Sequence, residues 1–149
     1  MNNQDYNATL TVSNTPKEAF DAINRVSDWW TANLEGSTKN PGDVFTLHWG
    51  DSFVTIKLVE AVPGKKVLWQ VTDCDLKWLD DKKEWRDTKM DFEISTVGDK
   101  TRINFTHIGL VPQVQCYNDC VKGWDQYVKG SLLKMLTEGI GEPQKLAAA

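Results

Sequence analysis

The sequence predicts an α+β fold, in which helices cover one face of an antiparallel sheet. Three observations predict it: a strand with period-two alternation opens the chain, a run of similar strands follows, and a long amphipathic helix closes it. The 149 residues, 40% hydrophobic and 26% charged, are typical of one globular domain. We therefore predict a single domain over residues 1–144 and read residues 145–149 (KLAAA) as a vector-derived tail.

The first strand is predicted over residues 6–13, because apolar and polar residues alternate there. Thr15 is followed by Pro16 and, three residues after it, by Glu18, the pattern of a capping box at the start of a helix. A second short helix is predicted at residues 28–30. These two short helices precede the turn-forming residues 33–43 (NLEGSTKNPGD), where we expect the chain to leave the core.

The middle of the chain predicts a series of antiparallel strands, because short turns separate them. The predicted strands are 44–49, 53–62, 67–72, 89–97 and 102–108. Residues 73–86 are rich in charge and predict a long hairpin tip or an extended edge. For the acidic cluster of Asp80, Asp81, Glu84 and Asp87 we favour a solvated tip over a functional site.

The final element is predicted as one amphipathic helix of about six turns. Its apolar positions, three or four residues apart, are Val114, Tyr117, Val121, Trp124, Val128, Leu132 and Met135. A single long helix across a curled sheet tends to leave a gap along its length.

Charge and cysteine content exclude several classes of function. With 17 basic and 21 acidic residues, the net charge of −4 argues against nucleic-acid binding. No apolar segment is long enough to span a membrane and no signal peptide is visible, so a cytoplasmic location is expected. Cys116 and Cys120 stand one helical turn apart; we favour two thiols over a metal or redox pair, because structural zinc usually takes four ligands. No metal or cofactor is expected.

Four segments also resemble a known family. The segments are TPKEAFDAINRVSDWW (15–30), GKKVLWQV (64–71), TRINFTHIGL (101–110) and KGWDQYVKGSLLKML (122–136). Their order and spacing resemble the START-like (SRPBCC, helix-grip) superfamily, and within it the subgroup named after the C-terminal domain of the activator of the 90-kDa heat-shock protein ATPase. The resemblance implies a curved antiparallel sheet wrapped around the long helix, with an apolar ligand held between them. The superfamily also includes cyclases, hydrolases and chaperone regulators, so the fold alone does not determine function.

His107 is the polar residue of greatest interest, because it continues the inward phase of its strand. It is either a hydrogen-bonding or general-base group of a cavity or a satisfied core histidine, and we favour the second interpretation. Seven tryptophans in one domain indicate an unusually aromatic core or an enclosed space. The predicted cavity residues are Trp30, Trp69, Phe92, Phe105, His107, Tyr117, Val121, Trp124 and Val128.

Three functions follow as alternatives. The first is a non-catalytic protein that binds an apolar or aromatic small molecule between sheet and helix. The second, implied by the subgroup resemblance, is a co-chaperone-like regulator whose partner is the 90-kDa heat-shock chaperone. The third is a cyclase- or hydrolase-like enzyme using His107, although no catalytic residue is assigned and no second titratable group shares its phase.

Overall fold

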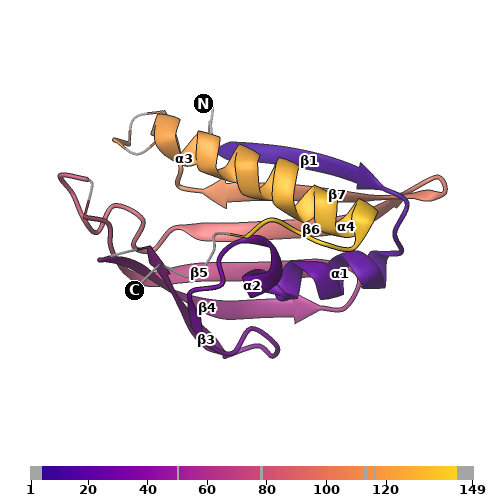
Figure 1. The fold of residues 1–149 in the computed structure, drawn as a ribbon, viewed down its shortest axis with the longest axis horizontal. Coiled ribbons are helices and arrows are strands. Elements are labelled where there is room, and N and C mark those ends of the chain that lie inside the picture. The colour runs from indigo at the N-terminus through magenta and orange to yellow at the C-terminus, as the bar shows by residue number, and fades with distance from the viewer. Residues whose placement is uncertain (1–4, 50, 78, 113, 116, 144–149) are drawn as a thin grey trace.

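The structure, a computed structural model, describes residues 5–49, 51–77, 79–112, 114–115 and 117–143. Within these residues a sheet of seven antiparallel strands has the order β1-β7-β6-β5-β4-β3-β2. The strands are β1 (Tyr6–Val12), β2 (Leu34–Gly36), β3 (Val44–Trp49), β4 (Ser52–Val62), β5 (Lys66–Asp75), β6 (Lys89–Val97) and β7 (Lys100–Ile108). The helices are α1 (Pro16–Asn24), α2 (Val26–Trp29), α3 (Tyr117–Trp124), the π-helical η1 (Asp125–Leu132) and α4 (Leu133–Glu138). The α+β helix-grip prediction is confirmed (Figure 1).

The start of the chain has the structure that its pattern predicts. Alternate residues of β1 are buried, and β1 pairs with β7 along its whole length. The Thr15 hydroxyl accepts a hydrogen bond from the Glu18 backbone N–H at 3.1 Å, and the Glu18 carboxylate accepts one from the Thr15 N–H at 2.8 Å. This capping box, with Pro16 in the first turn, begins α1, which buries Ile23 and two alanines.

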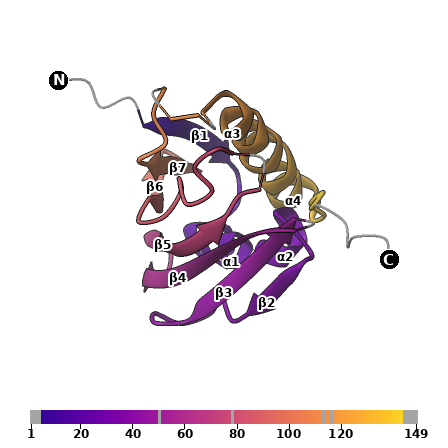
Figure 2. The same cartoon turned by 90° about the vertical axis from the view of Figure 1, so that its left-hand side faces the viewer.

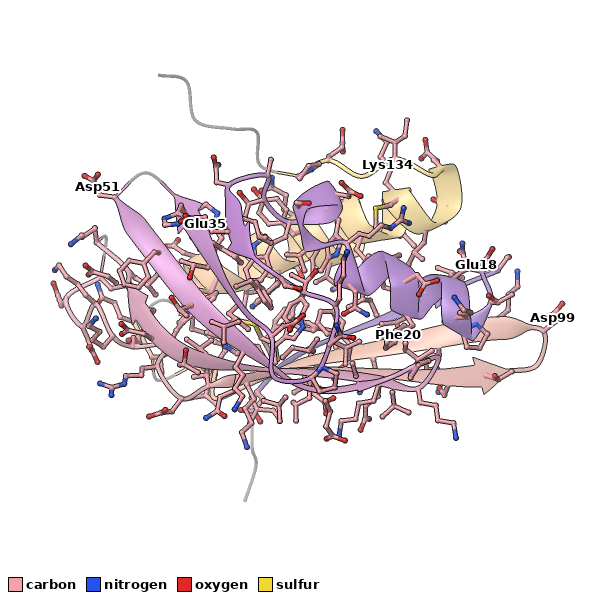
Figure 3. All side chains as sticks on the ribbon, turned by 90° about the horizontal axis from the view of Figure 1, so that it is seen from below. Glu18, Phe20, Glu35, Asp51, Asp99 and Lys134 are labelled. Atoms are coloured by element: carbon pink, nitrogen blue, oxygen red, sulfur yellow. The ribbon has the colours of Figure 1, made fainter. Side chains whose placement is uncertain are left out.

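The sheet curves strongly around the helices. β4 loses register with β5 between Thr55 and Ile56 and again between Leu58 and Glu60. Such irregularities bend a strand and increase its twist. Figure 2 shows the resulting arc from β1 round to β2, with α1, α2 and the C-terminal helix on its inner side. The β3–β4 and β6–β7 turns, marked by Asp51 and Asp99 in Figure 3, lie at opposite ends of the molecule.

The long C-terminal helix is continuous but not regular, so the prediction of one ordinary α-helix is wrong in its middle. Over η1 the helix widens to π geometry, in which each N–H bonds to the carbonyl five residues earlier. The apolar face persists, because Val128 and Leu132 are still fully buried. The π segment displaces the residues around it relative to an ideal 3.6-residue period.

Two segments between the predicted elements are also more structured than expected. Residues 34–36, placed in a loop by the sequence, form the edge strand β2 against β3. The tip predicted over residues 73–86 begins later in the structure, because residues 73–75 belong to β5. The described residues between β5 and β6, 76–77 and 79–88, expose Asp80 and Asp81 but bury Leu76, Leu79 and Trp85. In the described part of the chain, no helix combines the length and the apolar character needed to cross a membrane.

Candidate ligand-binding site

A pocket of about 250 Å³ opens at one end of the space between the sheet and the C-terminal helix. Five residues of α3 and η1 form its helical wall: Asp119, Cys120, Gly123, Trp124 and Tyr127. Trp124 is almost fully buried, whereas Gly123 and Tyr127 are half-buried and Asp119 is exposed. The helix therefore contributes both the floor and the rim of the pocket.

The opposite wall comes from four parts of the chain: the end of α2, two strands and the 76–88 loop. Trp30 follows α2, Trp49 ends β3, and Val54 lies in β4. Leu76 and Trp85 come from the 76–88 loop. All ten lining residues taken together supply five aromatic rings and one carboxylate. Such an apolar surface with few polar groups is typical of small-molecule sites.

Gly123 is the reason that the helix does not fill this space. A Cβ atom built on Gly123 would meet no heavy atom within 4 Å. The position of this Cβ is therefore open space at a residue that lines the pocket. Glycine is about 1 kcal/mol less favourable than Ala inside a helix, but at this position its missing side chain leaves the pocket open.

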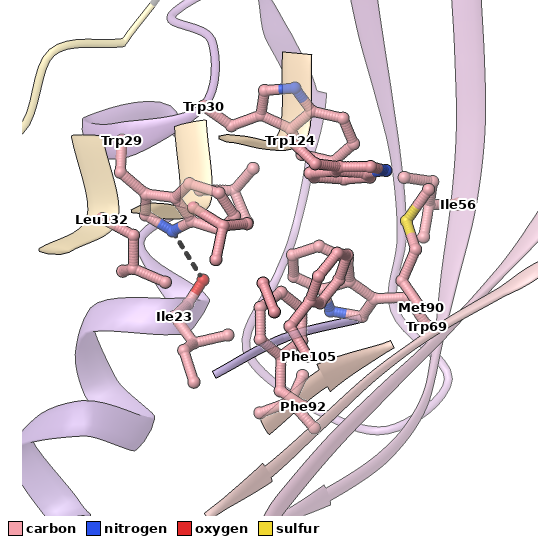
Figure 4. Close-up of a cluster of buried hydrophobic side chains, with 14 of the residues drawn as sticks. Ile23, Trp29, Trp30, Ile56, Trp69, Met90, Phe92, Phe105, Trp124 and Leu132 are labelled. Carbon is pink, nitrogen blue, oxygen red and sulfur yellow. Dashed lines mark hydrogen bonds between the residues drawn. The ribbon is translucent and has the colours of Figure 1, made fainter. Parts of the chain in front are cut away.

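The tryptophans within the described residues form one connected aromatic cluster that reaches from the core to the pocket. Trp69 stacks on Trp30, with ring centroids 6.1 Å apart and planes 11° apart. Trp30 in turn contacts Trp124 at 4.7 Å and Trp49 at 5.7 Å. Trp85 stacks on Trp124 at 6.1 Å and 10°. Figure 4 shows Trp30 lying beside Trp124, with Trp69 and Phe105 below them in the core.

Hydrogen bonds link His107 to two of the pocket tryptophans, directly to Trp124 and through Thr88 to Trp85. The indole Nε1–H of Trp124 donates to His107 Nδ1 at 3.0 Å. Because an indole N–H can only donate, Nδ1 must be unprotonated, and His107 Nε2–H must donate to the Thr88 hydroxyl at 2.9 Å. Thr88 then donates to the backbone carbonyl of Trp85 at 2.6 Å. This relay joins α3, β7 and the 76–88 loop behind the pocket.

The relay leaves His107 neutral and without solvent contact. Its exposed fraction is zero, and burial lowers the pKa of the imidazole from 6.5 to about 3. Both ring nitrogens are already hydrogen-bonded within the core. A general base must come within hydrogen-bond reach of a substrate proton, so the geometry favours a positioning role for His107.

Hydrogen bonds near the start and in the middle of the 76–88 loop hold it in place. The backbone N–H of Lys77 donates to the Ser52 hydroxyl at 2.8 Å, next to the β3–β4 turn. The N–H of Asp80 donates to the Gln115 side chain at 2.9 Å, and the N–H of Gln115 donates to the Glu84 carboxylate at 3.0 Å. The loop is thereby tied to the segment before α3, and Trp85 is fixed over Trp124.

The structure separates the predicted cavity residues into three groups. Trp30 and Trp124 line the pocket. Tyr117 and Val121 are half-buried on α3. The others have no exposed surface and lie in the core: Trp69, Phe92, Phe105, His107 and Val128. A ligand role for these residues stays a prediction.

Several lining residues were not among the predicted ones. Val54 and Trp49 could have been predicted from the sequence, because both continue the inward-facing alternation of their strands. Tyr127 carried none, because the π geometry of η1 changes which residues share a face. Trp85 and Leu76 lie in a segment without periodicity, and only the fold of the loop brings them to the pocket.

The structure describes two of the three cysteines, Cys74 and Cys120. Cys120 lines the pocket and is disulfide-bonded, which differs from the pair of thiols expected; Cys116 lies outside the described residues. Cys74 is a buried free thiol. Across the described ranges, no three His, Cys, Asp or Glu side chains gather in a way that could hold a metal ion.

Comparison with known proteins places the fold. The sequence model of the family described as "Activator of Hsp90 ATPase homolog 1-like protein" matches residues 16–137. No curated protein is significantly similar in sequence. Among solved structures, the Aha1 dimer from Colwellia psychrerythraea is similar with a TM-score of 0.75 and 21% identity, covering 92% of this chain and 98% of that chain.

Two further structures are similar at lower identity. MLL2253 from Mesorhizobium loti has a TM-score of 0.67 at 15% identity, over 90% of this chain and 98% of that chain. DynU16, a protein of the dynemicin biosynthetic locus, has the same TM-score and identity over 91% of this chain and 48% of that one. Likeness at such identities reports a shared fold.

Proposed function

This chain belongs to the Activator of Hsp90 ATPase homolog 1-like family, and from that premise we propose that it binds an apolar or aromatic small molecule without catalysing its conversion. One observation carries the proposal: the pocket of about 250 Å³ whose lining is almost entirely aromatic and aliphatic. Its volume lies just below the range of about 300–1,000 Å³ that is usual for drug-sized ligands, so a compact ligand fits best.

The wall residues support binding rather than mere packing. Trp30 and Trp124 are fixed by the core, through stacking on Trp69 and the hydrogen bond to His107. Rigid aromatic side chains offer a large contact area, and they lose little conformational freedom when a ligand binds. The pocket is therefore prepared for a flat or compact apolar molecule.

Titration of a panel of fatty acids, flavonoids and polyketides, followed by tryptophan fluorescence, tests this proposal. A binding ligand should change the emission of the wild-type protein with saturation. Gly123→Leu should abolish that change by filling the pocket, because its new side chain meets no atom within 4 Å of Cβ. Gly130→Leu is the matched control, since Gly130 is exposed on the same helix and does not line the pocket. Equal saturation in all three proteins, or none in any, would reject the proposal.

A second candidate function rests on the family description. The family is named for an activator of the Hsp90 ATPase, and the Aha1 structure from Colwellia psychrerythraea shares its fold with this chain. We infer a co-chaperone-like role as the alternative, with the 90-kDa heat-shock chaperone as partner. Measuring the ATPase rate of the bacterial chaperone with and without this protein decides it, and an unchanged rate together with no pull-down counts against it.

A further inference from the structure

We propose that the pocket selects a ligand bearing an N-alkylated ammonium group over neutral and anionic ligands of the same shape. This inference rests on the proposed function, because it concerns the occupant of the same pocket. It joins two features of the lining that the preceding proposal does not use: the identity of its aromatic rings and the single charge at its rim.

The rings surround the space from several directions. Trp30 follows α2, Trp49 ends β3, Trp85 lies in the 76–88 loop, and Trp124 and Tyr127 lie on the C-terminal helix. Trp30 is inclined at 48° to Trp124 and at 49° to Trp49, whereas Trp85 is stacked on Trp124 at 10°. The lining indoles therefore lie in more than one orientation. A cation within about 6 Å of an aromatic face is attracted by its quadrupole, and indole gives the strongest attraction of the protein rings.

The charge at the rim has the sign that a cation requires. Asp119 is the one charged side chain among the described lining residues, and the lining contains no Lys, Arg or His. Asp119 is exposed and forms no ion pair with any residue in the described ranges. Its carboxylate is therefore available to a ligand at the pocket mouth.

The same arrangement disfavours an anionic ligand. A fatty acid in this pocket would bring its carboxylate into a site with no basic side chain on the lining and with Asp119 at the rim. Like charges placed together across an interface weaken binding. The net charge of −4 over the whole chain acts in the same direction at long range.

An N-alkylated ammonium fits better than a primary one. A primary ammonium carries three N–H donors that lose water on entry and need acceptors. The lining offers the Asp119 carboxylate, the Tyr127 hydroxyl and little else that could accept. A trimethylammonium group has no N–H donor, so aromatic faces and one carboxylate can satisfy it.

Three probes of the same size class separate the possibilities: phenyltrimethylammonium, its neutral isostere tert-butylbenzene, and the anion benzenesulfonate. We expect phenyltrimethylammonium to bind about tenfold more tightly than tert-butylbenzene, by calorimetry and by tryptophan fluorescence. Benzenesulfonate should not bind measurably.

Two variants identify the groups responsible. Asp119→Asn keeps the shape of an exposed side chain, and should weaken phenyltrimethylammonium about threefold while changing tert-butylbenzene less than about twofold. Trp49→Leu, at a half-buried position, should weaken the cation about fivefold and retain the neutral probe, because leucine keeps apolar area but has no ring. Circular dichroism checks that both variants fold.

The outcomes distinguish this inference from the proposed function. If tert-butylbenzene binds as tightly as the cation, and Asp119→Asn alters neither, the ammonium preference is overturned and the pocket remains a site for neutral apolar ligands. If none of the three probes binds, the ammonium inference also fails, and the proposed function then depends on the wider panel and on its Gly123→Leu control.

Discussion

At one end of the aromatic cluster, Trp29 and Trp69 have no exposed surface; at the other, Trp49 is half-buried beside the pocket. The core end is closed by α1 and by Phe92, whose ring lies 4.9 Å from that of Trp69. The pocket end is bounded by a loop and by Gly123, which has no side chain. The same residue type thus fills space in one region and lines space in the other, depending on what its neighbours leave open.

The largest expected effect is a difference in the free energy of unfolding between variants at the core end and at the pocket end of the cluster. Trp69→Ala removes a fully buried indole from between the sheet and the helices, and should lower the free energy of unfolding by about 3–5 kcal/mol. Trp49→Ala should lower it by about 1 kcal/mol, because this ring is already partly in water. Urea denaturation measures both. Similar losses for the two variants would remove the distinction between a core end and a pocket end.

Trp69→Phe is the matched control for the core position. The Trp69 indole N–H is buried without an acceptor among the described residues. Phenylalanine removes that unsatisfied donor along with some apolar area, so the two contributions partly offset each other. The loss should stay well below that of Trp69→Ala.

The second prediction concerns the pH dependence of stability, which depends on the buried His107. The pKa of His107 is about 3 in the folded protein and 6.5 in the absence of burial. Below pH 6.5 the unfolded chain therefore binds a proton that the folded chain excludes, and the free energy of unfolding falls as pH is lowered, by about 1.4 kcal/mol per unit. Stability from this group is fully present above pH 6.5 and is lost towards pH 3.

His107→Gln tests this assignment. Glutamine can accept from Trp124 and donate to Thr88, but it does not titrate. Between pH 7 and pH 5 the wild type should lose about 2 kcal/mol more than the variant in urea titrations. Parallel pH curves for the two proteins would mean that His107 is not the buried neutral group described above.

The third prediction concerns the hydrogen bond that connects the edge strand β1 to the C-terminal helix. The Tyr6 ring packs edge-on against Phe105 in the core, and its hydroxyl donates to the Asp125 carboxylate at 2.6 Å, next to Trp124. Burial, with a further contribution from this hydrogen bond and the Asp125 charge, raises the pKa of Tyr6. Tyr6→Phe should cost about 1 kcal/mol. A double-mutant cycle with Asp125→Ala measures the coupling, and a coupling near zero would argue against the bond in solution.

The smallest expected effect comes from filling the pocket end. Gly123→Leu should raise stability by a few tenths of a kcal/mol to about 0.8 kcal/mol, because leucine is the better helix former and its Cβ has free space. Gly130→Leu should give a similar gain at an exposed site. Thermal unfolding compares them, and a clear destabilisation confined to Gly123→Leu would mean that the pocket is narrower than described.

Much of the fold follows from local patterns, whereas the site does not. The alternation in β1 and the Thr15–Glu18 capping box each specify an element from a few neighbouring residues. Trp30 and Trp124, two of the nine predicted cavity residues, are in the lining of the pocket, and their contact with a ligand stays a prediction. Trp85 could not be assigned to the pocket from the sequence. Its position depends on contacts between the 76–88 loop and residues distant in sequence, such as Gln115.

By itself, the sequence determined which faces of the strands and helices are apolar, because side-chain direction follows the period of each element. It also placed His107 on an inward face. Only the tertiary structure decided that this histidine is neutral and hydrogen-bonded on both nitrogens, and that Gly123 faces open space. Periodicity reports the direction of a side chain; whether a neighbour occupies the space in that direction depends on segments that meet only when the chain folds.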